Sequence, residues 1–228
     1  MEEFQKKKII DKMWGNYGKI LAEYIFIKNF RNSKKFSENI IVENELELNS
    51  IKINSKPVIF ISGHFNNFEL MAMHIEKSGI ELAAIYRPLN NKFLNPIMER
   101  IRKNSICKNQ IKKGISGTKA LLKYFKNGTS IALMIDQRVS EGIHSEFFNQ
   151  KALTTTIPAQ FVKKFDAQVV PIYIERTEDD TFKLKVYKSL HFSKNDSLKS
   201  ITLNLNKVLE KMIKKNPEQW IWTHSRWK

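Results

Sequence analysis

The sequence predicts an α/β fold in one domain, with a central, largely parallel or mixed sheet flanked by helices. Short apolar runs of strand length alternate along the chain with longer segments in which apolar residues recur at helical spacing. This alternation is typical of parallel sheets. A chain of 228 residues with 42% hydrophobic content can bury one substantial core, and no Pro/Gly/Ser-rich stretch divides it. We therefore expect residues 1–228 to form a single domain.

The first predicted element is an N-terminal amphipathic helix at about 3–30. Apolar residues recur there three or four positions apart, among them Ile9, Met13, Tyr17, Ile20 and Tyr24, and lysines surround them. Such a stripe most often packs on its own domain. Its aromatic and lysine content also suits a helix in a membrane interface. Core packing is the preferred interpretation, and partial membrane contact is the second.

The remaining elements follow from the same periodicities. A continuous apolar run at 57–61 predicts a strand covered on both faces of a sheet. Helical spacing predicts a helix at 66–78. The later predicted elements are a strand at 81–86, helices at 91–103 and 118–126, a strand at 130–135, a helix at 158–165, strands at 167–174 and 182–187, and a final amphipathic helix at 198–215.

A histidine and a carboxylate lie five positions apart just beyond the strand at 57–61. His64 falls on the turn after this strand, and Glu69 falls in the first turns of the next helix. Ligands of open α/β sheets bind at the carboxyl ends of the strands. A histidine can take a proton from an alcohol there while a carboxylate fixes its tautomer. Alone, this spacing is weak, because it occurs by chance in many proteins.

Arg87 follows the strand at 81–86 and is therefore expected on the same rim as His64. Its planar guanidinium suits a phosphate, because it forms bidentate charge-assisted hydrogen bonds. The competing interpretation is a surface arginine that pairs with the neighbouring helix. The histidines at 74, 144, 191 and 224 have no acidic partner at a recognisable spacing, so we assign them structural or surface roles.

The composition is strongly basic, with 39 Lys+Arg against 23 Asp+Glu and a formal net charge of +16. Such a surface attracts anionic partners: nucleic acid, an anionic membrane leaflet, a phosphorylated glycolipid or an acidic carrier protein. A biased genome is an alternative explanation for the many lysines. The single cysteine, Cys107, excludes an internal disulfide, and we expect it to be buried and inert. No run approaches the ~18–20 apolar residues that span a bilayer.

Several motifs occur in a fixed order along the chain. They are MWGNYG at 13–18 with AEY at 22–24, GHFNNFE at 63–69, YRPLNN at 86–91, DQR at 136–138, FF at 147–148 with the segment to 159, and PEQWIWTHSRW at 217–227. Together they resemble the bacterial lipid A biosynthesis late acyltransferases of the lauroyl/myristoyl type, which belong with the wider H-x4-D/E glycerolipid acyltransferases. The resemblance covers nearly the whole chain and implies a glycerolipid-acyltransferase-like sandwich.

The chain departs from the family's pattern at a few positions. Asn66 and Asn149 stand where glycine is usual, and Phe68 stands where tryptophan is usual. Asparagine tolerates a positive φ better than other non-glycine residues do, so we expect the backbone to be retained at both asparagines.

The resemblance implies an O-acyltransferase of lipopolysaccharide biosynthesis, which moves a fatty acyl chain from the thioester of acyl carrier protein to a hydroxyl of a lipid A precursor. It implies that His64, oriented by Glu69, is the catalytic base. The substrate-binding positions that it implies are Arg87, Asp136, Asn67, Tyr86 and Gln137. No metal or nucleotide cofactor is expected, since the acyl donor is a phosphopantetheine thioester.

The expected partners are acyl carrier protein, an anionic glycolipid acceptor and the inner-membrane surface, without nucleic acid. Family members usually carry an N-terminal anchor ahead of the region that matches Met13 onward, so we expect this chain to be peripheral on the cytoplasmic face of the bacterial inner membrane. The pattern specifies no oligomeric state. One alternative is a related acyltransferase that acts on a lysophospholipid or an amino-lipid. Another is a non-catalytic basic module that binds membrane or nucleic acid, in which the His-Glu pair is incidental.

Overall fold

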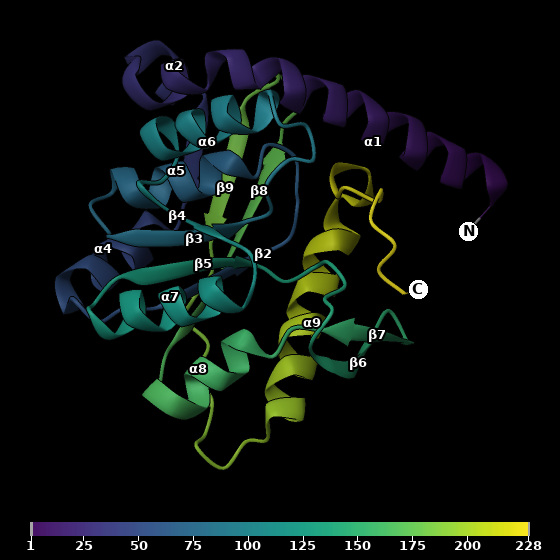
Figure 1. Ribbon diagram of the computed structural model, residues 1–228. Coiled ribbons are helices and arrows are strands. Elements are labelled where there is room, and N and C mark those ends of the chain that lie inside the picture. Colours follow the sequence, from purple (N-terminus) through teal and green to yellow (C-terminus); the bar gives the residue numbers. More distant parts are fainter. Residues whose placement is uncertain (1, 228) are drawn as a thin grey trace.

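The structure is a computed structural model and describes residues 2–227. A seven-stranded sheet has the order β1-β9-β8-β2-β5-β3-β4 (Figure 1). Its strands are β1 (Ile40–Glu43), β2 (Ile59–Ser62), β3 (Leu82–Tyr86), β4 (Asn109–Lys112), β5 (Ser130–Met134), β8 (Val169–Arg176) and β9 (Phe182–Val186). All neighbours pair in parallel except β8 and β9, which are antiparallel. The predicted α/β fold with a mostly parallel sheet is confirmed.

Helices cover both faces of this sheet (Figure 1). They are α1 (Glu3–Glu23), α2 (Ile27–Asn32), α3 (Lys34–Ser37), α4 (Glu45–Asn54), α5 (Glu69–Lys77), α6 (Leu94–Ser105), α7 (Ile115–Lys126), α8 (Ile157–Phe165) and α9 (Leu198–Lys215), with the 3-10 turns η1 (Tyr24–Phe26) and η2 (Pro217–Gln219). Right-handed crossovers place α5 and α6 on one face and α7 and α8 on the other, because the chain crosses the sheet in opposite directions. No helix among the described residues has both the length and the apolarity to cross a membrane.

The central strand β2 is buried along its whole length. It lies between β5 and β8, so the turn that follows it opens at the middle of the carboxyl edge of the sheet. This position fits a strand whose predicted sequence pattern is a continuous apolar run. Cys107 is also buried, as expected, and burial raises the pKa of its thiol to about 12.

Sequence reasoning missed the short strands β1 and β4 and a separate antiparallel hairpin, β6 (Ile143–Phe147) and β7 (Gln150–Thr154), which lies against α9. β1 and β4 are edge strands of four residues, which is too short to show a clear apolar period. The hairpin turns at Phe148 and Asn149, whose φ angles are 52° and 59°. This is the left-handed pair that a two-residue turn needs.

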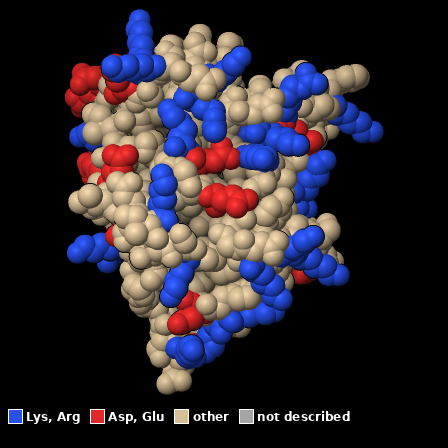
Figure 2. All heavy atoms as spheres, turned by 90° about the vertical axis from the view of Figure 1, so that its left-hand side faces the viewer, with Lys and Arg blue, Asp and Glu red and all other residues tan. Residues whose placement is uncertain are grey.

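The N-terminal apolar stripe is divided between two surroundings. Met13 and Ile20 of α1 are buried, whereas Ile10, Trp14 and Leu21 are exposed. Core packing therefore accounts for only one side of the stripe. Figure 2 shows Lys and Arg side chains scattered across the face that it draws, between larger areas of other residues, with fewer Asp and Glu side chains, in keeping with the net charge of +16.

Candidate active site

His64 and Asp136 meet at the carboxyl edge of the sheet. Each lies two residues beyond a paired position, because Ser62 of β2 is in register with Met134 of β5. The Ile135 N–H continues this pairing by donating to the Ser62 carbonyl at 2.9 Å. The two side chains therefore leave neighbouring strands at the same level, and His64 Nδ1 lies 2.8 Å from Asp136 Oδ1.

Asp136 is buried and accepts further hydrogen bonds at Oδ2. The backbone N–H of His64 and the indole N–H of Trp220 each donate to this oxygen at 2.8 Å. Burial disfavours the ionised carboxyl, but the imidazole and these donors outweigh it, so the pKa of Asp136 lies below its ordinary value. Asp136 is therefore the anionic partner of His64.

This arrangement fixes the state of the imidazole. Because an ionised carboxylate only accepts hydrogen bonds, Nδ1 carries the proton and Nε2 has a free lone pair. Burial disfavours the imidazolium, but Asp136 favours it more, and the pKa of His64 is raised above its usual value. The side chain is 20% exposed, and within residues 2–227 no hydrogen bond occupies Nε2. The Phe68 ring packs against the imidazole in a T-shaped contact, with 4.8 Å between the ring centres. The site thus presents an oriented base.

The prediction that Glu69 orients His64 is wrong in this structure. The Glu69 carboxylate is buried between η1 and α6, where Oε1 accepts from the Arg102 Nε–H at 2.8 Å and from the Tyr24 hydroxyl. Asp136 occupies the place beside Nδ1 instead, because β5 is the neighbour of β2. The charge of Glu69 still acts on His64 and helps to raise its pKa, with a smaller effect than that of Asp136.

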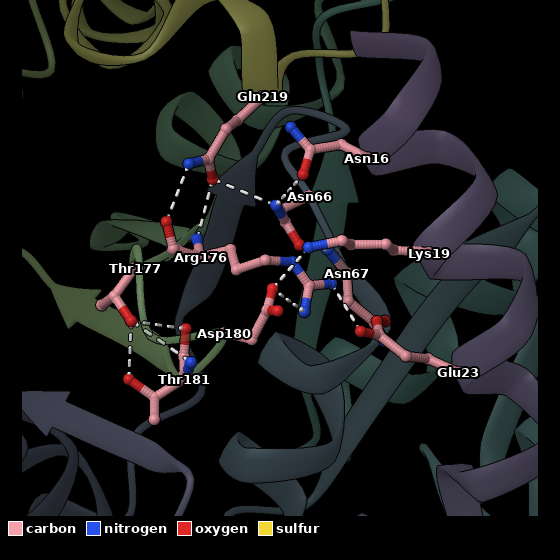
Figure 3. Close-up of polar contacts among 10 residues, drawn as sticks. All are labelled: Asn16, Lys19, Glu23, Asn66, Asn67, Arg176, Thr177, Asp180, Thr181 and Gln219. Atoms are coloured by element: carbon pink, nitrogen blue, oxygen red, sulfur yellow. Dashed lines mark hydrogen bonds and ion pairs between the residues drawn. The ribbon is translucent and has the colours of Figure 1, made fainter. Parts of the chain in front are cut away.

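Asn66 and Asn67 belong to a network that joins the His64 turn to α1, β8 and η2 (Figure 3). The Asn66 amide donates to Gln219 Oε1 at 3.1 Å. The Asn67 amide donates to Glu23 Oε2 at 2.8 Å, and Glu23 also pairs with Arg176 at 2.5 Å. Asn66 has φ 38°, as expected for an asparagine in place of glycine.

Two predicted substrate-binding residues are buried in internal contacts. Asn67 is fully buried in the network just described, and the oxygens of Asp136 are taken by N–H donors. Both side chains help to hold the His64 turn, and among the described residues Asn67 Oδ1 has no hydrogen-bond partner. A part for either residue in substrate binding stays a prediction.

The other predicted binding residues lie on the rim of the site. Arg87 is exposed directly after β3, and within residues 2–227 it forms no ion pair, so the expected competitor, a salt bridge to the neighbouring helix, is not observed. Gln137, which follows Asp136, is partly exposed. Tyr86 lies under Arg102, whose guanidinium carbon is 5.7 Å from the ring centre, and burial together with Glu99 raises the pKa of Tyr86 to about 12. Their contact with substrate stays a prediction.

The described residues contain no group of three or more His, Cys, Asp or Glu side chains that could hold a metal ion. The site presents an imidazole that is oriented by a carboxylate. An imidazole with a buried carboxylate partner can remove a proton from a hydroxyl group.

Residues 1–228 match the protein family described as bacterial lipid A biosynthesis acyltransferase. The chain belongs to this family. Curated relatives agree at low identity. Lipid A biosynthesis acyltransferase 2 from Shigella flexneri is 22% identical over 84% of this chain and 62% of its own length. The lipid A biosynthesis palmitoleoyltransferase of Escherichia coli K12 is 22% identical over 82% of this chain and 61% of its length.

The lipid A biosynthesis lauroyltransferase of the same E. coli strain is 24% identical over 100% of this chain and 74% of its length. This chain thus spans about three fifths of the length of the first two relatives. Among solved structures, the 1-acyl-sn-glycerophosphate (LPA) acyltransferase PlsC from Thermotoga maritima is similar with a TM-score of 0.46 and 10% identity, over 96% of this chain and 99% of that one.

The structure of this lipid A acyltransferase family member adds site residues that sequence reasoning missed. Trp220 forms a bridge with Phe65 and donates to Asp136, and the N–H of Ile221 donates to the His64 carbonyl at 3.0 Å. The C-terminal segment 217–227 therefore packs against the His64 turn. The motif of this segment was visible in the sequence. No local pattern shows that the segment contacts a turn about 150 residues earlier in the chain.

Two more residues of this segment have shifted pKa values. Burial lowers the pKa of His224, and the charges of Asp136 and His64 also act on it. The structural or surface role expected for His224 stays a prediction. Arg226 is fully buried and donates to the Leu153 carbonyl at 2.8 Å. Burial lowers the pKa of Arg226 to about 10. Arg226 thus fixes the end of the C-terminal segment to β7.

Proposed function

We propose that this protein is an O-acyltransferase that moves a fatty acyl chain from the thioester of acyl carrier protein to a hydroxyl of a lipid A precursor. One observation carries the proposal: His64 is held by Asp136 with Nε2 free at the carboxyl edge of the sheet. Membership of the bacterial lipid A biosynthesis acyltransferase family supports acyl transfer as the reaction.

In the proposed reaction, His64 Nε2 removes the proton of the acceptor hydroxyl, and the hydroxyl oxygen attacks the thioester carbonyl carbon. The tetrahedral intermediate collapses, the C–S bond breaks, and the imidazolium returns the proton to the leaving thiolate. Asp136 stabilises the imidazolium throughout, because its carboxylate lies 2.8 Å from Nδ1. A positioned general base typically contributes about 10²–10⁴-fold to the rate. No acyl-enzyme is required.

Arg87 is the proposed anion-binding residue. It is exposed on the rim, and within the described part of the chain it has no carboxylate partner, so its guanidinium is available to a phosphate of the acceptor or of the phosphopantetheine arm. The oxyanion of the intermediate would be stabilised by backbone N–H groups or a basic side chain, each worth roughly 3–4 kcal/mol when well placed.

We assign Glu69 a positioning role. Through Arg102 and Tyr24 it ties the first residue of α5 to α6 and to the end of α1. The turn that carries His64 immediately precedes α5, so this cluster fixes one end of the turn. The net charge of +16 supports an anionic partner, and we propose the cytoplasmic face of the inner membrane as the place of action.

The function is tested by incubating the purified protein with an acyl carrier protein thioester and a phosphorylated lipid A precursor, and following the product by mass spectrometry. A product heavier by one acyl chain is expected, and a lysophospholipid or an amino-lipid acceptor should give less. Preference for one of these lipids would establish the alternative acyltransferase. No transfer to any acceptor, with vesicle binding retained, would favour the non-catalytic basic module.

A further inference from the structure

A group of apolar side chains is exposed where the chain leaves β3 and enters α6. The exposed fractions are 40% for Leu89, 88% for Phe93, 52% for Leu94 and 56% for Ile97. Phe93 and Ile97 are four positions apart and Leu94 and Ile97 are three apart, so they share one side of the start of α6. We call Leu89, Phe93, Leu94 and Ile97 the rim patch.

Basic residues flank the rim patch. Arg87 and Lys92 are exposed in the same loop, and residues 87–97 contain no acidic residue. The end of β4 adds Lys112 and Lys113, because Tyr86 pairs with Lys112 and the Lys113 N–H donates to the Tyr86 carbonyl at 2.9 Å. Lys112 pairs with Glu99 at 3.2 Å. The apolar group is thus bordered by a net positive charge.

The rim patch lies at the same edge of the sheet as the catalytic pair. β3 is the neighbour of β5, and both strands run parallel to β2. The loop after β3 therefore opens on the same edge as His64 and Asp136. A ligand or membrane that bound the rim patch would therefore lie beside the catalytic pair.

We propose that the rim patch docks the protein on an anionic lipid bilayer, with Phe93, Leu94 and Ile97 in the interface and the flanking basic residues on lipid phosphates. This inference rests on the proposed function, because the lipid acceptor has to be reached from a membrane. Exposed apolar side chains with basic neighbours suit a bilayer interface, where apolar contact and attraction to anionic lipid act together.

The shape of the rim patch favours a bilayer over a protein partner. With 88% of Phe93 exposed, the side chain protrudes and does not line a groove. A protein partner would need a complementary pocket for it, whereas a bilayer accepts protruding side chains without one. Acyl carrier protein is the competing occupant. The exposed side of α1, with Ile10, Trp14 and Leu21, is a competing membrane surface. It lies beside α6, because the Tyr24 hydroxyl at the end of α1 is 3.2 Å from the Arg102 guanidinium of α6.

The first test compares vesicle binding of the parent with that of the triple variant Phe93→Ser, Leu94→Gln, Ile97→Gln. The control is Leu46→Gln, Ile53→Gln on α4, whose parent side chains are 80% and 79% exposed. Vesicles of phosphatidylcholine with phosphatidylglycerol should bind the parent and the control, and the triple variant should bind at least about tenfold more weakly. Equal binding of the triple variant and the parent overturns the proposal.

The second test reports which surface enters the bilayer. A cysteine is introduced by Phe93→Cys, Ile53→Cys or Trp14→Cys and labelled with an environment-sensitive fluorophore. The native Cys107 is fully buried and does not compete. Anionic vesicles should blue-shift the label at position 93 and leave that at position 53 unchanged. A shift at position 14 without one at position 93 assigns the docking to α1 and overturns the proposal.

Turnover separates this proposal from the proposed function. The triple variant should keep parental turnover on detergent-dispersed acceptor and lose it on acceptor in vesicles. If the parent is inactive but the vesicle and label results hold, the docking surface stands and the proposed function fails. If the triple variant loses affinity for acyl carrier protein while it still binds vesicles, the rim patch is a carrier surface and the bilayer proposal fails.

Discussion

The hydrogen-bond partner of the His64 imidazole decides which nitrogen can act as a base. The Asp136 carboxylate accepts a hydrogen bond from the Nδ1–H of His64, and it accepts another from the indole N–H of Trp220. This leaves Nε2 without a proton and with a free lone pair. At the scale of single residues, two predictions follow from these contacts.

We predict that His64→Ala and Asp136→Asn each reduce acyl transfer by about 10²–10⁴-fold while the protein stays folded. The first removes the base. The second replaces an acceptor with an amide that can donate to Nδ1, which favours the tautomer with a proton on Nε2. Initial rates and the far-UV circular dichroism spectrum of each variant give the measurement. A folded His64→Ala variant with parental turnover would contradict the mechanism.

The second prediction concerns Trp220 as a positioning residue. Because Nε2 has to be unprotonated, activity should rise with pH through the raised pKa of His64. Trp220→Phe removes the indole donor that lowers the pKa of Asp136. The carboxylate then attracts the imidazolium more strongly, so the acidic limb of the kcat/KM profile should move to higher pH.

Trp222→Phe is the matched control for this variant. The Trp222 ring lies 4.5 Å from the Trp220 ring, but its indole donates to the Pro217 carbonyl at 2.7 Å and not to Asp136. Its pH profile should coincide with that of the parent. If both variants shift the acidic limb equally, the effect comes from packing, and the role assigned to the Trp220 N–H is refuted.

At the scale of elements, buried polar contacts join α1, α5 and α6 to the His64 turn. Glu69→Gln should lower the free energy of unfolding by up to about 3 kcal/mol, because the guanidinium of Arg102, which is only 14% exposed, loses its anionic partner. Tyr24→Phe removes a neutral hydroxyl that donates to Glu69 and accepts from Arg102, and it should cost less, about 1–2 kcal/mol. Chemical denaturation measures both. Equal stability of Glu69→Gln and the parent would show that this cluster does not tie the helices together.

Two asparagines in left-handed backbone provide a matched pair of substitutions. Asn66 bonds to Gln219 and to the N–H of Asn67, whereas Asn149 is exposed at the tip of the β6–β7 hairpin. Asn66→Gly should therefore lower the free energy of unfolding by about 1–3 kcal/mol. Asn149→Gly should leave it unchanged or raise it by up to about 1 kcal/mol, because glycine relieves the strain of a positive φ. Thermal or urea unfolding of both variants decides. If Asn149→Gly lowered the free energy of unfolding more than Asn66→Gly, the stabilising role assigned to the Asn66 side chain would be wrong.

At the scale of the whole molecule, the net charge of +16 should govern membrane adsorption. We predict reversible binding to anionic vesicles that weakens as salt rises, since each nearby Lys or Arg contributes about 1 kcal/mol and is screened beyond a Debye length of about 10 Å at 0.1 M salt. Co-sedimentation across a salt series is the measurement. Adsorption that ignores both lipid charge and salt would refute the electrostatic account, and any salt-resistant remainder measures the apolar contribution.

The sequence by itself determined the elements with strong local periodicity. The helix predicted at 198–215 has these bounds as α9, and the predicted strands at 81–86 and 130–135 agree with β3 and β5 to within one residue. It also placed His64 just beyond one strand and Asp136 at the end of another. Apolar spacing along one element depends only on which of its faces is buried.

Only the tertiary structure decided which carboxylate holds His64. Glu69 is five positions away in sequence, yet the partner is Asp136, 72 residues away, because β5 pairs with β2 in the sheet. Trp220 reaches Asp136 from 84 residues further along the chain because the C-terminal segment folds back over the His64 turn. Strand order and chain reversal depend on contacts between distant segments, and no local pattern records them. The sequence therefore identified the types of residue at the site, whereas the role of each residue could be assigned only from the fold.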